Sequence, residues 1–301
     1  MTASLVSDAA TITPGQPFTV ALRLQHEPHW HSYWIAPGTG YATSITWTLP
    51  AGFKAGDIQW PTPHRLLDAT GKIVGNGYSD EAFLLVEITP PALPGFRTPA
   101  AAEAARLVPG GQQAATGPLA PGATVTLQAA VDWLMCQDVC MPGDAKLAIS
   151  FPVGPAQADP AWTAALAAAR AQLPVADPRW NLSASRGAKT ITLRVTPQPG
   201  NTHQPEDLRF FAADGLTDYT APGTVTREQG GWVISKRLDA AADPKTARLT
   251  GVLSSANGWH DGAGFGGLVV DVPLTDEAGR GVASAPSPAN QVSHLPSQSS
   301  P

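Results

Sequence analysis

The stretch 124-TVTLQAAVDWLMCQDVCMPGDAKLAISFPV-153 contains the only two cysteines of this 301-residue chain, Cys136 and Cys140. Alternating apolar and polar residues predict strands over 124–133 and 145–153, on either side of the pair. Extended backbone would hold the two Cα atoms roughly 13 Å apart, whereas a disulfide requires less than about 7 Å. If the cysteines bond, the segment must therefore turn back on itself, as at a hairpin tip or in a single helical turn.

A disulfide between Cys136 and Cys140 would be a weak structural brace, because on chain-entropy grounds so short a loop contributes only about 2 kcal/mol. A chain of this length can also bury a core without a covalent link. Thiol–disulfide exchange, a minor structural disulfide and metal binding all remain open on this evidence. Asp132 and Asp138 lie nearby and no Lys or Arg does, which favours a pair that accepts electrons from an incoming thiolate. Asp138 could also relay a proton.

The metal alternative depends on the neighbours of the cysteines. Met135 and Met141 flank the pair, and thioethers with thiolates are soft ligands suited to Cu(I). His31 could approach such a site from another part of the fold. Zinc is less favoured, because no second Cys/His pair stands at a usual spacing. Plain packing beside a hairpin tip is the simpler explanation of the methionines.

A second stretch, 29-HWHSYW-34, carries five rings in six residues. Strand alternation would place Trp30, Ser32 and Trp34 on one face, and the two histidines with Tyr33 on the other. One face can serve the core. The other would present imidazoles and a phenol, which suggests contact with a partner or a cover over a reactive site. An aromatic core strand with histidines at its rim is the alternative.

Short strands joined by turns are expected over the rest of the chain, because 30 prolines and 29 glycines disfavour long helices. The one predicted helix spans 160–173, with Asp159 as its cap and Pro160 in its first turn. Residues 75–78, Gly-Asn-Gly-Tyr, are interpreted as a turn. The other predicted strands are 11–24, 45–49, 83–88, 190–196, 208–212, 225–227, 231–238, 247–254 and 267–273.

These patterns predict an all-β chain of two β-sandwich domains joined by a short helical linker. The expected divisions are a first domain at 1–155, a linker at 156–177, a second domain at 178–275 and a flexible linker at 276–301. Residues 92–123 have no periodicity and are expected to form a mobile excursion. The second domain contains no cysteine, and its sequence does not indicate what it does.

Composition excludes some classes of function. The net charge is −5 and no basic run is present, so nucleic-acid binding is not expected. No apolar stretch reaches the roughly 20 residues that span a bilayer. Residues 1–6 resemble folded-domain sequence rather than a signal peptide, which indicates a cytosolic protein or one that has lost a targeting segment.

Residues 132–142 resemble the cysteine motif in the periplasmic N-terminal region of DsbD-like thiol:disulfide interchange proteins. The short Cys-x3-Cys spacing is similar to that of the ScsB branch. Residues 29–38, 45–53 and 58–61 also look like that branch. The resemblance covers about residues 1–155, and beyond them only the layout is similar.

The resemblance implies an immunoglobulin-like fold for the first domain and protein-disulfide reductase activity, with a redox-active disulfide and no other cofactor. The second β-sandwich is expected to be immunoglobulin-like as well. Cys136 and Cys140 would be the exchanging pair. The side chains expected to line the site are Tyr33, His31, Asp138, Trp133, Met135 and Met141.

The resemblance also implies where the protein works and with what. The chain would be periplasmic and tethered to the inner membrane in the full-length protein. It would take electrons from the membrane-embedded reductase domain of that protein and pass them to periplasmic thioredoxin-like disulfide proteins. Links to cytochrome c biogenesis and copper tolerance are implied as well. A Cu(I)-binding module that uses the same cysteines is the alternative.

Overall fold

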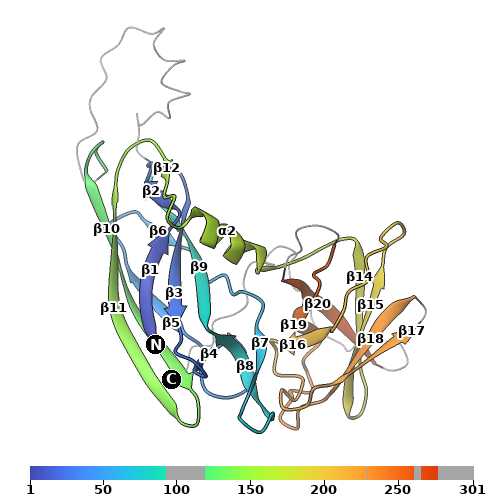
Figure 1. Cartoon of the computed structure of the whole chain (residues 1–301). Coiled ribbons are helices and arrows are strands. Elements are labelled where there is room, and N and C mark those ends of the chain that lie inside the picture. The colour runs from blue at the N-terminus through green and yellow to red at the C-terminus, as the bar shows by residue number, and fades with distance from the viewer. Residues whose placement is uncertain (93–118, 229, 261–265, 277–301) are drawn as a thin grey trace.

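The computed structural model describes residues 1–92, 119–228, 230–260 and 266–276. Within them the chain is all-β apart from helix α2 (Thr163–Ala171), and it forms two β-sandwich domains with the short helix between them in sequence (Figure 1). The predicted fold class is confirmed. The expected excursion at 92–123 falls mainly on residues 93–118, and the expected linker at 276–301 on 277–301, which lie outside the described residues.

The first sandwich consists of two sheets and a small ribbon. One sheet has the order β1 (Thr2–Ser7), β3 (Phe18–Gln25), β9 (Glu81–Thr89), β6 (Lys54–Ala55). The other has the order β11 (Cys140–Pro152), β10 (Thr124–Cys136), β4 (His31–Tyr33), β8 (Ile73–Ser79), β7 (His64–Leu67), and β5 (Ser44–Thr48) also pairs with β10. The ribbon joins β2 (Ala9–Thr11) to β12 (Gln157–Ala158).

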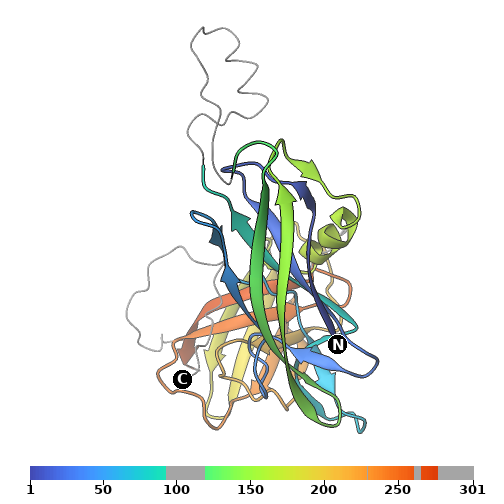
Figure 2. The same ribbon diagram turned by 90° about the vertical axis from the view of Figure 1, so that its left-hand side faces the viewer.

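The β10–β11 hairpin runs the length of this domain (Figure 2). On β10 the odd-numbered residues from Val125 to Trp133 are buried, and the even-numbered ones from Thr124 to Asp132 are exposed. This alternation follows from the period of two residues in a strand, which places one face on the core and the other in solvent. The inner face packs with residues of β3 and β9 such as Leu22 and Leu84.

Helix α2 lies on the first domain. Leu166 and Ala169 pack with Val6, Ala21 and Leu85, which belong to β1, β3 and β9. Before the helix, a carboxylate oxygen of Asp159 accepts a hydrogen bond from the Ala161 N–H (2.9 Å), and the helix itself begins at Thr163. The predicted helix is therefore present but shorter than expected. The domain boundaries given above stay predictions.

In the second sandwich the strand order is β16-β19-β20-β14-β15-β18-β17. These strands are β14 (Trp180–Arg186), β15 (Thr190–Pro197), β16 (Arg209–Ala212), β17 (Thr224–Glu228), β18 (Gly231–Arg237), β19 (Arg248–Ser254) and β20 (Gly267–Asp276); β13 (Pro174–Val175) pairs with β20. Trp180, Trp232 and Trp259 are buried in its core. Trp180 packs edge to face on Trp232 and Trp259, with ring centroids 5.9 and 5.3 Å apart. This geometry lets the three rings share one core.

The turn predicted over residues 75–78 is wrong, because these residues lie inside β8. Gly77 is needed there for close packing rather than for a turn: a Cβ on it would lie 2.0 Å from the carbonyl oxygen of Ser32. Gly75 likewise lies against the ring of Tyr33. The local composition is typical of a turn. The requirement for glycine comes instead from close contact with β4, which lies more than 40 residues earlier in the chain.

Candidate redox site

The two cysteines form a disulfide at the end of the β10–β11 hairpin. Cys136 is the last residue of β10, Cys140 is the first of β11, and they are direct cross-strand partners with Cα atoms 4.1 Å apart. Three residues make the turn, and the Gln137 N–H donates to the Val139 carbonyl at 3.1 Å. Of the two geometries that the sequence left open, the hairpin tip is the one observed.

The two sulfur-bearing residues differ in environment. Cys136 is 2% exposed, whereas Cys140 is exposed. Its neighbours Val139 and Met141 are also exposed, by 63% and 46%. A large reagent such as a second protein therefore reaches the disulfide from the Cys140 side.

Strand β4 places its aromatic residues beside the disulfide. His31 is the cross-strand partner of Cys136, and partners across an antiparallel pair share a face. The alternation predicted for 29-HWHSYW-34 holds within β4 and the next residue: His31 and Tyr33 lie on the disulfide side, and Trp34 enters the core. Tyr33 and Cys136 pack with Leu66, Leu134 and the partly buried Val74.

Tyr33 contacts the sulfur of the exposed cysteine, Cys140. Its hydroxyl lies 3.9 Å from Sγ of Cys140. Its ring fits between two glycines: a Cβ on Gly40 would lie 3.0 Å from one ring carbon, and a Cβ on Gly75 would lie 2.9 Å from another. Burial, and secondarily the neighbouring Tyr219, raises the pKa of Tyr33. The phenol therefore keeps its proton at neutral pH and can donate to a sulfur.

His31 stands beside the buried sulfur. Its side chain is 6% exposed, and its ring meets that of Tyr33 edge to face with centroids 5.4 Å apart. Among the described residues Nε2 of His31 is buried and has no hydrogen-bond partner. Burial lowers the pKa of His31, so the imidazole is neutral at pH 7. A neutral imidazole can take up a proton near neutral pH, and this one belongs to the cross-strand partner of Cys136.

The other residues expected to line the site lie in the turn or on the opposite face of the hairpin. Asp138 is exposed in the turn. Trp133 and Met135 pack into the core on the opposite face of β10. Met141 is the cross-strand partner of Met135, so it shares that opposite face.

This placement bears on the copper alternative. A Cu(I) site built from both sulfur types would need the methionines and the cysteines on one side of the hairpin, and the register separates them. In the described part of the chain, no three His, Cys, Asp or Glu side chains lie close enough to hold a metal ion together. We therefore do not propose a copper site.

Sequence reasoning missed part of the site. The glycines around Tyr33, the apolar Leu66 and Leu134, and Tyr219 of the second domain were not identified as its components. The Gly-rich run after Trp34, 37-PGTG-40, is the one local signal that could have indicated close packing. Tyr219 lies 186 residues from Tyr33 in sequence, and no local pattern connects them.

The chain was compared with known proteins. A family model for the N-terminal domain of the thiol:disulfide interchange protein DsbD matches residues 3–152. The crystal structure of the N-terminal periplasmic domain of ScsB from Proteus mirabilis is similar, with a TM-score of 0.55 and 18% sequence identity. That likeness covers 90% of this chain and 92% of the other, and at this identity it shows a shared fold. No curated protein matches the chain in sequence.

No helix among the described residues is long and apolar enough to cross a membrane.

The family match includes the whole β10–β11 hairpin and the aromatic stretch before it, and it covers nearly the same residues as the predicted resemblance. Residues 3–152 therefore belong to the family of DsbD N-terminal domains, and this part of the chain is a DsbD- and ScsB-like thiol:disulfide interchange domain.

Proposed function

We propose that this chain relays electrons by thiol–disulfide exchange at Cys136 and Cys140, as the periplasmic portion of a protein-disulfide reductase tethered to the inner membrane. The position of the disulfide carries the proposal: it closes a hairpin with one residue exposed and the other buried. A bond that contributes only about 2 kcal/mol to folding has little structural value there. Its accessibility suits exchange with a second protein.

Electron uptake begins at the exposed cysteine. A thiolate of the donor attacks Sγ of Cys140 and forms a mixed disulfide, while the Cys136–Cys140 bond breaks. The electron pair leaves on Cys136 as a thiolate, which takes up a proton. The second thiolate of the donor then attacks the mixed disulfide and releases Cys140. The donor departs as a disulfide, and the pair has gained two electrons.

Electron delivery reverses these roles. The Cys140 thiolate attacks a disulfide of the acceptor protein, and Cys136 resolves the mixed disulfide by attacking Sγ of Cys140. The Tyr33 hydroxyl next to Cys140 can donate a hydrogen bond to that thiolate. His31, the cross-strand partner of Cys136, adds an imidazole that burial keeps neutral.

The proposed donor is the membrane-embedded reductase domain of the same full-length protein. The proposed acceptors are periplasmic thioredoxin-like disulfide proteins. Two findings support these assignments: the matching family is named for thiol:disulfide interchange, and the similar ScsB structure is described as periplasmic.

The first test is the reduction potential of the Cys136–Cys140 couple, measured by thiol trapping in glutathione and dithiothreitol buffers. We expect a reversible couple above about −300 mV, the usual upper limit of structural disulfides. A potential well below that value would contradict the exchange role and indicate a structural bridge.

The second test uses the single variants Cys136→Ser and Cys140→Ser with a thioredoxin-like protein as the reaction partner. Both variants should lose turnover. Cys136→Ser should accumulate a mixed disulfide through Cys140, whereas Cys140→Ser should trap little because its remaining sulfur is buried. Equal trapping by the two variants would contradict the assignment of Cys140 as the attacked residue.

A further inference from the structure

We propose that the second sandwich domain is a positioning element of the redox site, and that its Tyr219 holds Tyr33 in place against Cys140. This inference rests on the exchange function proposed above. It gives a role to a domain that itself contains no cysteine. Three contacts carry it, and each lies within a few residues of a member of the disulfide cluster. This cluster consists of Tyr33, Leu66, Leu134 and Cys136.

The first contact follows Tyr33 directly. Tyr33 faces the disulfide, and the next residue, Trp34, is fully buried on the other side of the strand. There it packs with Phe211 of β16 and Val252 of β19, and the Trp34 and Phe211 ring centroids are 6.4 Å apart. Because consecutive strand residues point to opposite faces, the second domain fixes the backbone that carries Tyr33 from behind.

The second contact is made by Tyr219. Its ring covers Gly38 so closely that a Cβ on this glycine would lie 2.2 Å from the ring. Two residues later, Gly40 lies against Tyr33 and Leu134. Tyr219 also contributes, after burial, to the raised pKa of Tyr33, which places the two phenols near each other. The 36–41 segment therefore lies between a ring of the second domain and the ring that contacts the disulfide.

The third contact anchors the loop that carries Tyr219. Arg65 donates a hydrogen bond to the carbonyl of Pro222 at 2.5 Å, and Arg65 immediately precedes Leu66 of the disulfide cluster. Within the second domain, Lys236 donates a hydrogen bond to the carbonyl of Ala221 at 2.6 Å. The loop is thus bound both to its own domain and to a strand of the first.

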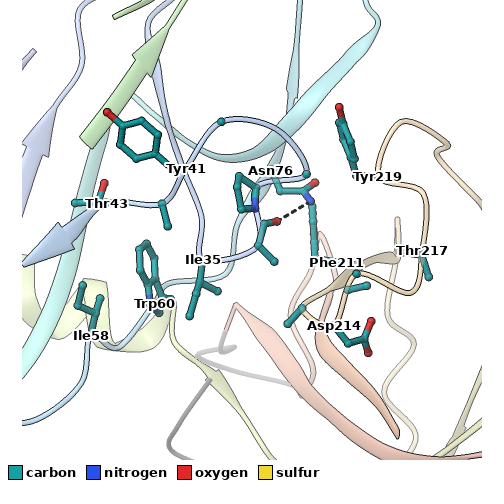
Figure 3. Close-up of a pocket in the computed structure, with 18 of the residues that line it drawn as sticks. Ile35, Tyr41, Thr43, Ile58, Trp60, Asn76, Phe211, Asp214, Thr217 and Tyr219 are labelled. Carbon is teal, nitrogen blue, oxygen red and sulfur yellow. Dashed lines mark hydrogen bonds between the residues drawn. The ribbon is translucent and has the colours of Figure 1, made fainter. Parts of the chain in front are cut away.

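A cavity between the two domains is lined by residues of both, including the 36–41 segment. It measures about 1100 Å³, with Tyr41 and Asn76 on one wall and Phe211 and Tyr219 on the other (Figure 3). Asn76 donates to the carbonyl of Ala36 at 3.3 Å, drawn as a dashed line in Figure 3. The segment after β4 lines this cavity at Gly38 and Gly40, and Gly40 also lies against Tyr33.

The test compares how fast dithiothreitol reduces the Cys136–Cys140 disulfide in the oxidised 301-residue protein and in its variants. Tyr219→Ala removes the ring from Gly38, so Tyr33 loses its support over Cys140, and we expect the rate to rise at least fivefold. Tyr219→Phe keeps the ring and should stay within twofold of the unmodified protein. The exposed Val225 on β17 provides the control Val225→Ala, which should leave the rate unchanged.

A second readout follows Tyr33 itself. The chain has four tyrosines, so their ionisation can be followed individually by NMR with ¹³C-labelled tyrosine. We expect the pKa of Tyr33 to fall in both Tyr219 variants, because each removes the second phenol. A role of Tyr219 confined to stability of its own domain would change the unfolding midpoint and leave the reduction rate at 25 °C unaltered.

Three outcomes are decisive. If folded Tyr219→Ala is reduced at the rate of the unmodified protein, the positioning role is overturned. If Tyr219→Ala does not fold, Arg65→Gln decides in its place: it removes the anchor to Pro222, and an unchanged rate there overturns the inference equally. Absence of any reversible exchange in the unmodified protein would instead refute the proposed function.

Discussion

The outer face of the β10–β11 hairpin differs between its length and its tip. Along its length the outward residues of β10 are polar or small and lie in solvent, and β5 beside it presents Ser44, Thr46 and Thr48, which are also exposed. At the tip the same face carries Leu134 and Cys136, and both are buried. One strand thus changes from a solvated outer face to a covered one within its last three residues.

The neighbouring strand explains the change. β5 pairs with the body of β10, and β4 pairs with its end. The outward residues of β4 are His31 and Tyr33, which are large and buried. An exchange site needs one protected sulfur and one accessible one, and this hairpin provides both by receiving an aromatic cover only at its end. Each of the following predictions tests that contrast.

The largest expected loss of stability is at Gly77, the cross-strand partner of Tyr33. Gly77→Ala would bring a Cβ to 2.0 Å from the Ser32 carbonyl oxygen, so β8 and β4 must separate, and we expect a loss of about 4 kcal/mol in urea unfolding. Gly56→Ala is the control, since its Cβ would meet atoms only at 3.5 Å or more. Equal losses at the two glycines would show that the cover over the tip does not depend on this close approach.

The next prediction compares the loss of stability at the tip of the hairpin with that along its length. Leu134→Ala removes a buried side chain at the tip, and Gln128→Ala shortens an exposed one on the same face of the same strand. We expect the free energy of unfolding to fall by about 3 kcal/mol in the first case and by less than about 0.5 kcal/mol in the second. Similar values for both would mean that the outer face is solvated along its whole length.

A smaller effect is expected when the disulfide itself is lost. Replacing both Cys136 and Cys140 by serine should reduce the free energy of unfolding by about 2 kcal/mol, because the bond closes a short loop. Reduction of the unmodified protein should give a similar value in urea unfolding. A loss above about 5 kcal/mol would indicate that the bond braces the tip and would weaken the case for exchange.

The smallest effect concerns pH. Burial lowers the folded-state pKa of His31 below 6.5, so between the two pKa values the unfolded chain binds more protons, and stability falls as the pH drops through this range. His31→Phe should reduce that loss between pH 7.5 and 5.5, because the variant has no imidazole to desolvate. His26 and His64, whose pKa values burial also lowers, contribute slope of the same sign. An unchanged slope in urea titrations would mean that His31 is not desolvated at the tip.

Much of the site could be predicted from local patterns. Two alternating runs on either side of a close cysteine pair require the chain to reverse there, and alternation within 29-HWHSYW-34 separates Tyr33 from Trp34. The turn prediction at 75–78 failed because glycine serves two purposes, φ freedom and close approach, and only the partner strand distinguishes them. For the same reason the lining assigned to Met135 and Met141 followed sequence proximity, although neighbouring residues in a strand face opposite ways.

The sequence by itself determined the all-β class, the helix before the second domain and the reversal of the chain between the cysteines, because these depend on residue period and short spacing. The resemblance to DsbD-like N-terminal regions was likewise carried by motifs of the sequence, such as residues 132–142. Tertiary structure alone decided which cysteine is buried, since the cover comes from Tyr33, Leu66 and the 36–41 segment. It also decided that Phe211 and Tyr219 support this cover. Burial is set by residues distant in the chain, and no local pattern encodes which distant residues will meet.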